Sequence, residues 1–102
     1  MLLKTISALL PVLFAIVSAK DVGGGELKFF GVPRQNQNDL YKCYGNDNSD
    51  RNYIEVANQK NYPVQLFHQA GCTSNPPPEW VAAKEAKRLE GVYLSWRFVR
   101  DS

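Results

Sequence analysis

Residues 62–83, YPVQLFHQAGCTSNPPPEWVAA, decide the fold. They open with apolar side chains at every second position, at Tyr62, Val64 and Leu66, a spacing that predicts a half-buried strand. A cysteine, a polar break and three consecutive prolines follow, and the prolines lead directly into Trp80. A strand, a covalent anchor, a rigid spacer and a large aromatic side chain therefore lie within one short stretch, and we expect the rest of the chain to pack around them.

Residues 1–19 have the order of a secretory signal peptide. A positive charge at Lys4 precedes a mostly apolar run at 6–17, and small residues come directly before the expected cleavage point. The apolar run is too short to cross the ~30 Å of hydrocarbon in a bilayer. We therefore expect residues 1–19 to be cleaved from a secreted protein without a membrane span. A flexible lead-in at 20–25 and a single domain at 26–102 would remain.

Two cysteines, Cys43 and Cys72, lie in the expected secreted domain. An even number of cysteines in a small secreted chain predicts a disulfide, and here only one pairing is available. Because a domain of this size has a small hydrophobic core, the covalent link should supply much of its stability. Closing a loop of this length is expected to stabilise the fold by about 3.6 kcal/mol. Two free buried thiols are the alternative.

Short segments with alternating or apolar patterns are separated by turn-forming residues, of which the run GNDNSDR at 45–51 is the strongest signal. Pro33 has no N–H to donate and is expected to end the first strand. The polar residues 58–61 have the length of a hairpin connection, so the segments on either side are predicted to be antiparallel neighbours. A small β-sandwich or barrel is therefore expected, with strands at Leu27–Val32, Leu40–Tyr44, Asn52–Ala57, Val64–Gln69 and Val92–Val99.

The segment 80–89 allows two interpretations. Its alanine, lysine, glutamate and leucine residues favour a helix, with a proline just before it and a glycine just after it. This composition predicts one short helix between Ala82 and Glu90. The rigid proline run before Trp80 instead favours a short strand at Trp80 and Val81. Both interpretations remain open.

Charge and motif content exclude several classes of function. The 12 Lys and Arg side chains less Lys4 leave 11, against 10 Asp and Glu, and no basic stripe is present, so nucleic-acid binding is not expected. One histidine, His68, and two paired cysteines cannot supply the three or four ligands of a zinc site. The motifs HExxH, CxxC and GxSxG are absent. The sequence therefore predicts a monomer without a catalytic site, cofactor or metal.

One enzymatic alternative rests on two short motifs. Tyr41-Lys42-Cys43 and Tyr62-Pro63 loosely resemble motifs of the microbial guanyl-specific ribonucleases, whose fold some powdery-mildew effectors share. This resemblance would make Glu55, His68 and Arg97 the general base, the general acid and the phosphate-binding group of an RNA-cleaving or RNA-binding protein. It also implies a helix laid across one sheet. The histidine that these enzymes tend to carry just after the Tyr-Pro pair is absent here.

A more specific resemblance covers residues 72–83. A cysteine, a short polar run and then Pro78-Glu79-Trp80-Val81-Ala82-Ala83 are similar to the C-terminal part of several MAX effectors, the small secreted avirulence and ToxB-like proteins of blast fungi. The signal peptide, the two cysteines and the β-rich pattern also fit this family. The resemblance implies a small antiparallel β-sandwich of six strands with one disulfide, and a protein that is not an enzyme.

The MAX resemblance also implies a function in recognition. Members of the family bind host plant proteins, and some are recognised through HMA domains of plant immune receptors, which implies translocation into the host cytoplasm. A small sandwich can bind by adding an exposed edge strand to a partner's sheet. Tyrosine and arginine are enriched at interface hot spots, so solvent-facing residues of these types would be sensible anchors: Tyr41, Tyr53, Tyr93 and Arg97. Ordinary sheet packing is the alternative role for each.

Overall fold

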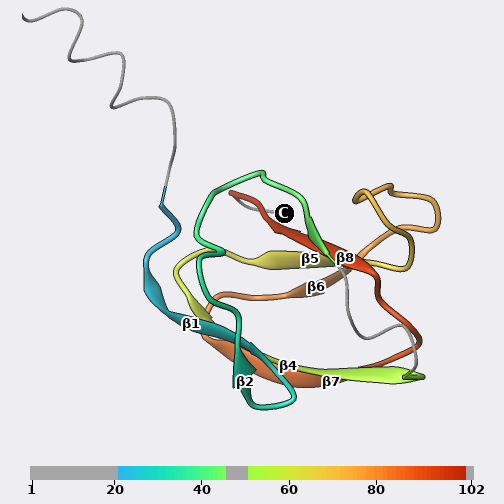
Figure 1. Cartoon of the computed structure of the whole chain (residues 1–102), viewed down its shortest axis with the longest axis horizontal. Coiled ribbons are helices and arrows are strands. Elements are labelled where there is room, and N and C mark those ends of the chain that lie inside the picture. Colours follow the sequence, from blue (N-terminus) through green and yellow to red (C-terminus); the bar gives the residue numbers. More distant parts are fainter. Residues whose placement is uncertain (1–20, 46–50, 101–102) are drawn as a thin grey trace, which may run out of the picture.

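A computed structural model describes residues 21–45 and 51–100. Within these two ranges the chain forms eight strands and no helix, arranged as two antiparallel sheets of four strands around a shared core (Figure 1). The predicted β-sandwich is therefore confirmed, with eight strands where six were expected. The predicted signal peptide at 1–19 lies outside the described residues.

The first sheet has the strand order β2-β1-β4-β7, and the second has the order β3-β8-β5-β6. Every pair of neighbouring strands is antiparallel. The chain therefore crosses repeatedly between the two sheets, which ties them together. The strands are β1 (Gly24–Phe29), β2 (Val32–Pro33), β3 (Tyr44–Gly45), β4 (Tyr53–Lys60), β5 (Val64–Phe67), β6 (Glu79–Val81), β7 (Glu85–Glu90) and β8 (Ser95–Phe98).

The core lies between the sheets and follows from the alternation of side chains along each strand. In β4, Ile54 and Val56 point inward and are buried, while Glu55 between them faces outward and is exposed. The largest buried side chain is Trp96 of β8, whose ring meets that of Phe29 of β1 edge to face at 4.5 Å. Trp96 thus takes the central position that the sequence suggested for Trp80, which lies half-buried on the edge strand β6.

Residues 58–62 carry the chain from the first sheet to the second. The predicted hairpin pairing of β4 with β5 is wrong, because these two strands lie in different sheets. The buried Asn58 side chain provides a physical reason. Its amide donates to the carbonyl groups of Tyr62, Val81 and Ala82 at 3.0, 3.3 and 3.1 Å. These bonds fasten the start of β5 and the end of β6 against the inner face of β4.

Residues 80–89, for which the sequence allowed either a helix or a strand, form strand and turn. The Ala82 N–H donates to the Glu85 carboxylate, and the Glu85 N–H donates to the Ala82 carbonyl, so a turn joins β6 to β7. The predicted helix between Ala82 and Glu90 is therefore wrong, and the alternative of a short strand at Trp80 is confirmed. All six residues of β7 pair with β4, and this pairing outweighs the helix propensity of the segment.

Residues 21–25, expected as part of a flexible lead-in, belong to the fold. Val22 is completely buried, and its backbone N–H and C=O are both hydrogen-bonded. β1 begins at Gly24, which has a φ of +76° and packs so tightly that a Cβ there would lie 2.6 Å from the Gln59 carbonyl oxygen. Only glycine fits this position, so the glycine run reflects close strand packing rather than a mobile terminus.

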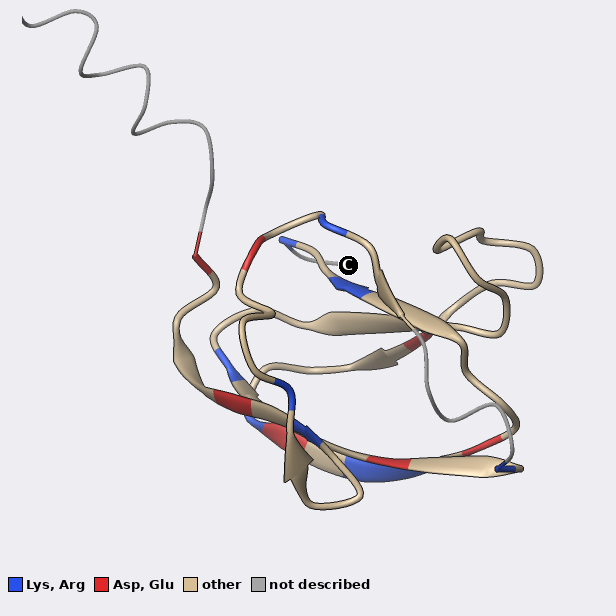
Figure 2. Ribbon diagram, in the orientation of Figure 1, with Lys and Arg blue, Asp and Glu red and all other residues tan. Residues whose placement is uncertain are grey.

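Charged residues are distributed unequally between the two sheets (Figure 2). The strands of the first sheet contain eight Asp, Glu, Lys or Arg residues, two in β1, two in β4 and four in β7. The strands of the second sheet contain two, one in β6 and one in β8. The first sheet, and β7 above all, therefore presents most of the charge that the strands carry.

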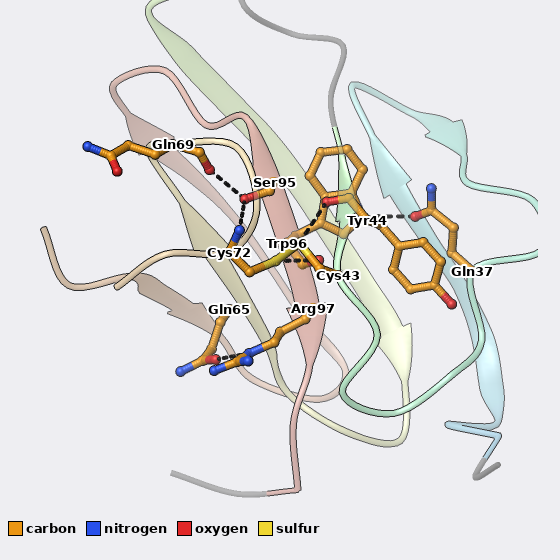
Figure 3. The surroundings of a disulfide bond; sticks show 9 residues. All are labelled: Gln37, Cys43, Tyr44, Gln65, Gln69, Cys72, Ser95, Trp96 and Arg97. Atoms are coloured by element: carbon orange, nitrogen blue, oxygen red, sulfur yellow. Dashed lines mark hydrogen bonds between the residues drawn. A yellow bond between two sulfur atoms is a disulfide. The ribbon is translucent and has the colours of Figure 1, made fainter. Parts of the chain in front are cut away.

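The predicted disulfide between Cys43 and Cys72 is present (Figure 3). It joins the segment just before β3 to the loop after β5, and both of these strands pair with β8. The Cys72 N–H donates to the hydroxyl of the buried Ser95 at 2.9 Å, and this hydroxyl donates to the Gln69 carbonyl. A β8 side chain therefore holds the loop in place at the covalent link.

Candidate protein-binding edge

The longest exposed strand edge is the side of β7 that faces away from β4. β7 has six residues, and none of the described strands pairs with its second side. An edge strand presents backbone N–H and C=O groups that a strand from another chain can use for pairing. The six residues of β7 are therefore the part of the sandwich best suited to strand addition.

The alternation of hydrogen bonds identifies the residues of β7 that face outward. The Gly91 N–H donates to the Asn52 carbonyl, so the odd-numbered residues of β7 direct their backbone groups to β4. On the other side of β4, the Phe30 N–H donates to the Glu55 carbonyl, which gives the same alternation. The outward-facing backbone groups of β7 therefore belong to Ala86, Arg88 and Glu90.

Two contacts limit this outward-facing series. At its C-terminal end the Tyr93 hydroxyl donates to the Glu90 carbonyl at 2.9 Å. At its N-terminal end the chain turns at Lys84, whose Nζ donates to the Gln59 carbonyl at 2.8 Å. The accessible groups are therefore the N–H and C=O of Ala86 and of Arg88 and the N–H of Glu90, which we call the β7 edge.

Tyr93 limits the β7 edge from inside the fold. It was predicted to face solvent, and this prediction is wrong, because only 2% of its surface is exposed and its ring stacks on His68 with centroids 4.3 Å apart. Burial raises the pKa of the Tyr93 phenol, and the carboxylates of Glu79 and Glu90 raise it further. The neutral phenol therefore remains a hydrogen-bond donor to the end of β7.

The other three sheet edges, at β2, β3 and β6, expose fewer backbone N–H and C=O groups than β7 does. The Arg34 N–H donates to Leu27 and the Val99 N–H to Pro63, which fixes the alternation at the remaining strands. By this alternation β2, β3 and β6 each turn a single residue outward: Pro33, Gly45 and Trp80. The first strand ends at Phe29, before Pro33, and the proline lies in β2 where its missing N–H costs no ladder bond.

A row of aromatic and arginine side chains lies on the outer face of the first sheet, beside the β7 edge. The Arg88 guanidinium is 3.8 Å from the centroid of the Tyr53 ring, and the Arg51 guanidinium is 3.9 Å from that of Phe30. The two rings meet edge to face at 5.5 Å. These contacts restrict Arg88, yet 56% of its side chain stays exposed. Arg88 is therefore an ordered and accessible cation next to the edge.

A shallow hollow of about 350 Å³ is present on the same face. It is lined by Ala57 and Ala86, which are directly opposite each other on β4 and β7, and by Gly31, Glu55 and Arg88. Two alanines in a cross-strand pair leave the sheet surface low between larger side chains. Because Ala86 also belongs to the β7 edge, the hollow and the edge form one continuous surface.

Acidic and basic side chains both lie along the β7 edge. Four of the six residues of β7 are charged, in the order EAKRLE, and Figure 2 shows acidic and basic segments following one another along the strand. The Glu90 carboxylate lies 3.7 Å from the Arg88 guanidinium. Charged side chains on an edge strand oppose non-specific pairing. The charged side chains of β7 therefore oppose non-specific pairing at the β7 edge.

The four predicted anchor residues do not form one surface. Tyr53 contacts Arg88 of β7, and Tyr93 contacts Glu90 of β7 from the interior. Tyr41 and Arg97 belong to the other side of the sandwich. The Tyr41 N–H donates to β8, and Arg97 of β8 donates to the Gln65 amide oxygen of β5 at 3.0 Å. Of the four, Tyr53 alone lies on the outer face of the first sheet beside β7, where it is half-buried.

The residues of the ribonuclease alternative lie apart. Glu55 faces outward from the first sheet and Arg97 outward from the second, so the core separates them. His68 follows β5, packs on Tyr93 and contacts the Val92 carbonyl through Nδ1 at 2.9 Å. Across residues 21–45 and 51–100 there is no helix over either sheet, no cluster of three metal-ligating side chains and no helix able to span a membrane.

The sequence patterns did not identify β7, the strand that carries the candidate site. Its residues show no alternation of apolar and polar side chains, because both of its faces are largely exposed. The signal that could have found it is the dense mixture of charges itself, which is typical of a protected edge strand. Comparisons with models of protein families, with curated proteins and with solved structures find no match to this chain.

Proposed function

We propose that this protein is a secreted effector that acts by binding a plant protein through the β7 edge. The observation that carries the proposal is the outward direction of the backbone groups of Ala86 and Arg88 on the longest edge strand. A strand of the partner would pair with these groups and extend the first sheet. Backbone pairing would supply affinity, and the neighbouring side chains would supply selectivity.

Two further features support this function. Two packed antiparallel sheets and one disulfide agree with the general architecture that the MAX resemblance implied. Arginine and tyrosine are common hot-spot residues, and the contact between Arg88 and Tyr53 is formed without a partner. Little side-chain entropy would therefore be lost at this contact on binding. The MAX resemblance also supplies a candidate partner, an HMA domain of a plant immune receptor.

The substitution Ala86→Pro tests edge binding and should leave the protein folded. Proline removes the N–H of residue 86, which points away from β4, and its ring obstructs an approaching strand. Isothermal titration of the protein with HMA domains from plant immune receptors measures the affinity. We expect a partner to bind the wild type and to bind Ala86→Pro at least about tenfold more weakly, since one or two backbone hydrogen bonds are lost.

Tyr41→Ala is the matched control for this experiment. Tyr41 is 55% exposed and lies on the side of the second sheet, so its loss should leave the affinity unchanged. Circular dichroism and thermal melting establish that both variants are folded. Unchanged binding by a folded Ala86→Pro variant, or a loss of binding in Tyr41→Ala alone, would contradict a site at the β7 edge.

A further inference from the structure

We infer that the strand which pairs with the β7 edge is acidic and belongs to a different protein, not to a second copy of this chain. This inference rests on the proposed function. We take the partner strand to be antiparallel to β7, which is the orientation of every neighbouring strand pair within the sandwich. The partner strand carries acidic residues opposite Arg88 and Lys87, followed by a large apolar residue opposite Ala86.

The two residues at the centre of β7, Lys87 and Arg88, are both basic, and one lies on each face of the sheet. Arg88 lies on the outer face over Tyr53, where the Glu90 carboxylate is 3.7 Å away and Glu55 of β4 is directly opposite. The adjacent residue Lys87 points to the other face and is exposed. Among the described residues no carboxylate pairs with Lys87. The acidic residues of the strand lie at its two ends, where the Glu85 carboxylate accepts the Ala82 N–H. Acidic residues opposite the centre would form two favourable cross-strand pairs.

A second copy of this chain fits the edge poorly. Two copies related by a two-fold axis must pair their outward-facing residues, Ala86, Arg88 and Glu90, with one another. The two registers with the longest overlap then place Arg88 opposite Arg88, or Lys87 opposite Lys87. Like charges directly opposite each other are destabilising. Registers that avoid both contacts pair only half of the strand, so β7 discriminates against self-association.

The apolar position of the partner strand follows from the hollow. A residue opposite Ala86 projects onto the outer face, because opposite residues of neighbouring strands share a face. Ala86 and Ala57 leave space there, and Arg88 also lines it. A large apolar side chain would cover both alanines and displace water from them. The recognised sequence is therefore acidic, acidic, apolar in the direction of the partner chain.

Three hairpin peptides test this specificity. Each displays one free strand: Thr-Thr-Glu-Glu-Phe-Thr, the same strand with both glutamates replaced by lysine, and the same strand with phenylalanine replaced by alanine. The oxidised protein is titrated at low salt, because exposed charge pairs are screened, and its amide signals are followed by NMR. We expect the lysine peptide to bind about tenfold more weakly than the acidic peptide, and the alanine peptide about fivefold more weakly.

The charge-reversal variant Arg88→Glu provides the decisive comparison. It should lose affinity for the acidic peptide and gain affinity for the lysine peptide, while circular dichroism confirms that it is folded. In the wild type, the acidic peptide should slow hydrogen exchange at the amides of Ala86 and Arg88, and this readout needs no variant. Sedimentation should show that the protein alone remains a monomer at the concentrations used.

The remaining outcomes of these experiments distinguish a failure of the acidic specificity from a failure of edge binding itself. Equal affinity for the acidic and lysine peptides, with the β7 amides still protected, overturns the acidic specificity and leaves edge binding intact. Absence of binding by the acidic peptide up to millimolar concentration overturns the specificity too, while the HMA titration decides edge binding separately. Protection confined to amides outside β7 contradicts both. A dimer formed through β7 overturns the choice of a different protein as partner.

Discussion

The two sheets of this sandwich protect their edges in different ways. In the second sheet the edge strands are short and anchored: β3 has two residues and follows the disulfide-bonded Cys43, while β6 has three residues and follows three prolines. In the first sheet β2 carries Pro33, but β7 is six residues long and is protected by charge alone. The first three edges each turn a single residue outward, whereas β7 turns three residues outward among charged side chains.

This difference has a physical consequence for binding. An edge strand of two or three residues offers a single outward-facing residue to any partner, and at β2 that residue is a proline without an N–H. Charge blocks an edge only while it is uncompensated, since an opposite charge turns the same contact from repulsive to attractive. Under the proposed function, the charges that protect β7 would also select its partner, and the following variants test this comparison.

Removal of the disulfide should have the largest effect on stability. The variant with both Cys43→Ala and Cys72→Ala opens the closed side of the sandwich, where the linked residues are separated by 29 positions. We expect a loss of about 3–4 kcal/mol in the free energy of unfolding, measured by chemical denaturation. A loss below about 1 kcal/mol would mean that the short edges of the second sheet hold themselves in place.

Two neighbouring proline substitutions should differ because of the alternation along β7. Lys87→Pro removes an N–H that is directed to β4 and should cost about 2–3 kcal/mol. Ala86→Pro removes an N–H that points outward and should cost less than about 1 kcal/mol. Thermal and chemical unfolding of the two variants measures the difference. Equal destabilisation, or the reverse order, would show that the outward-facing residues of β7 have been assigned incorrectly.

Tyr93→Phe should change the dependence of stability on alkaline pH. The pKa of Tyr93 is raised in the folded state, so above pH ~10 the folded protein keeps a proton that the unfolded chain loses. The stabilisation is complete below that pH and is lost as the pH rises through the folded-state value. The variant should lose about 1 kcal/mol at neutral pH, from the missing hydrogen bond to Glu90, and should lose less on going to alkaline pH.

Tyr41→Phe is the control for the alkaline experiment, because Tyr41 is exposed where Tyr93 is buried. Denaturant unfolding of both variants between pH 7 and pH 11 should show the wild-type alkaline loss in Tyr41→Phe and a smaller loss in Tyr93→Phe. An unchanged alkaline loss in Tyr93→Phe would assign that loss to other groups.

The sequence was sufficient for the fold class because the relevant signals are local. The alternation around Ile54 and Val56 marks a half-buried strand, and two cysteines allow one pairing. The path of the chain between the sheets was not predictable in this way. It depends on the Asn58 amide, whose carbonyl partners include residues 23 and 24 positions away. No local pattern reports a contact of that range.

The candidate site was harder to predict because an exposed edge strand lacks the signals that identify buried strands. β7 buries little of its surface, so its sequence carries no strand-like apolar alternation. Its composition, considered alone, favours a helix. Tyr93 was predicted to face solvent because a regular alternation was assumed from residue 92 onward. β8 begins only at Ser95, and the irregular chain before it turns the Tyr93 ring into the core. Of the residues that the sequence suggested as anchors, only Tyr53 lies on the outer face of the first sheet beside β7.

Hydrogen exchange along β7, measured by NMR with and without a bound partner, tests the central claim most directly. In the free protein the amides of Lys87 and Leu89 should exchange slowly, because they face β4, and those of Ala86 and Arg88 should exchange quickly. Binding of an HMA domain or of the acidic hairpin should protect Ala86 and Arg88 and leave the other two unchanged. Protection of Ala86 and Arg88 already in the free protein, or none on binding, would contradict a free β7 edge that receives a partner strand.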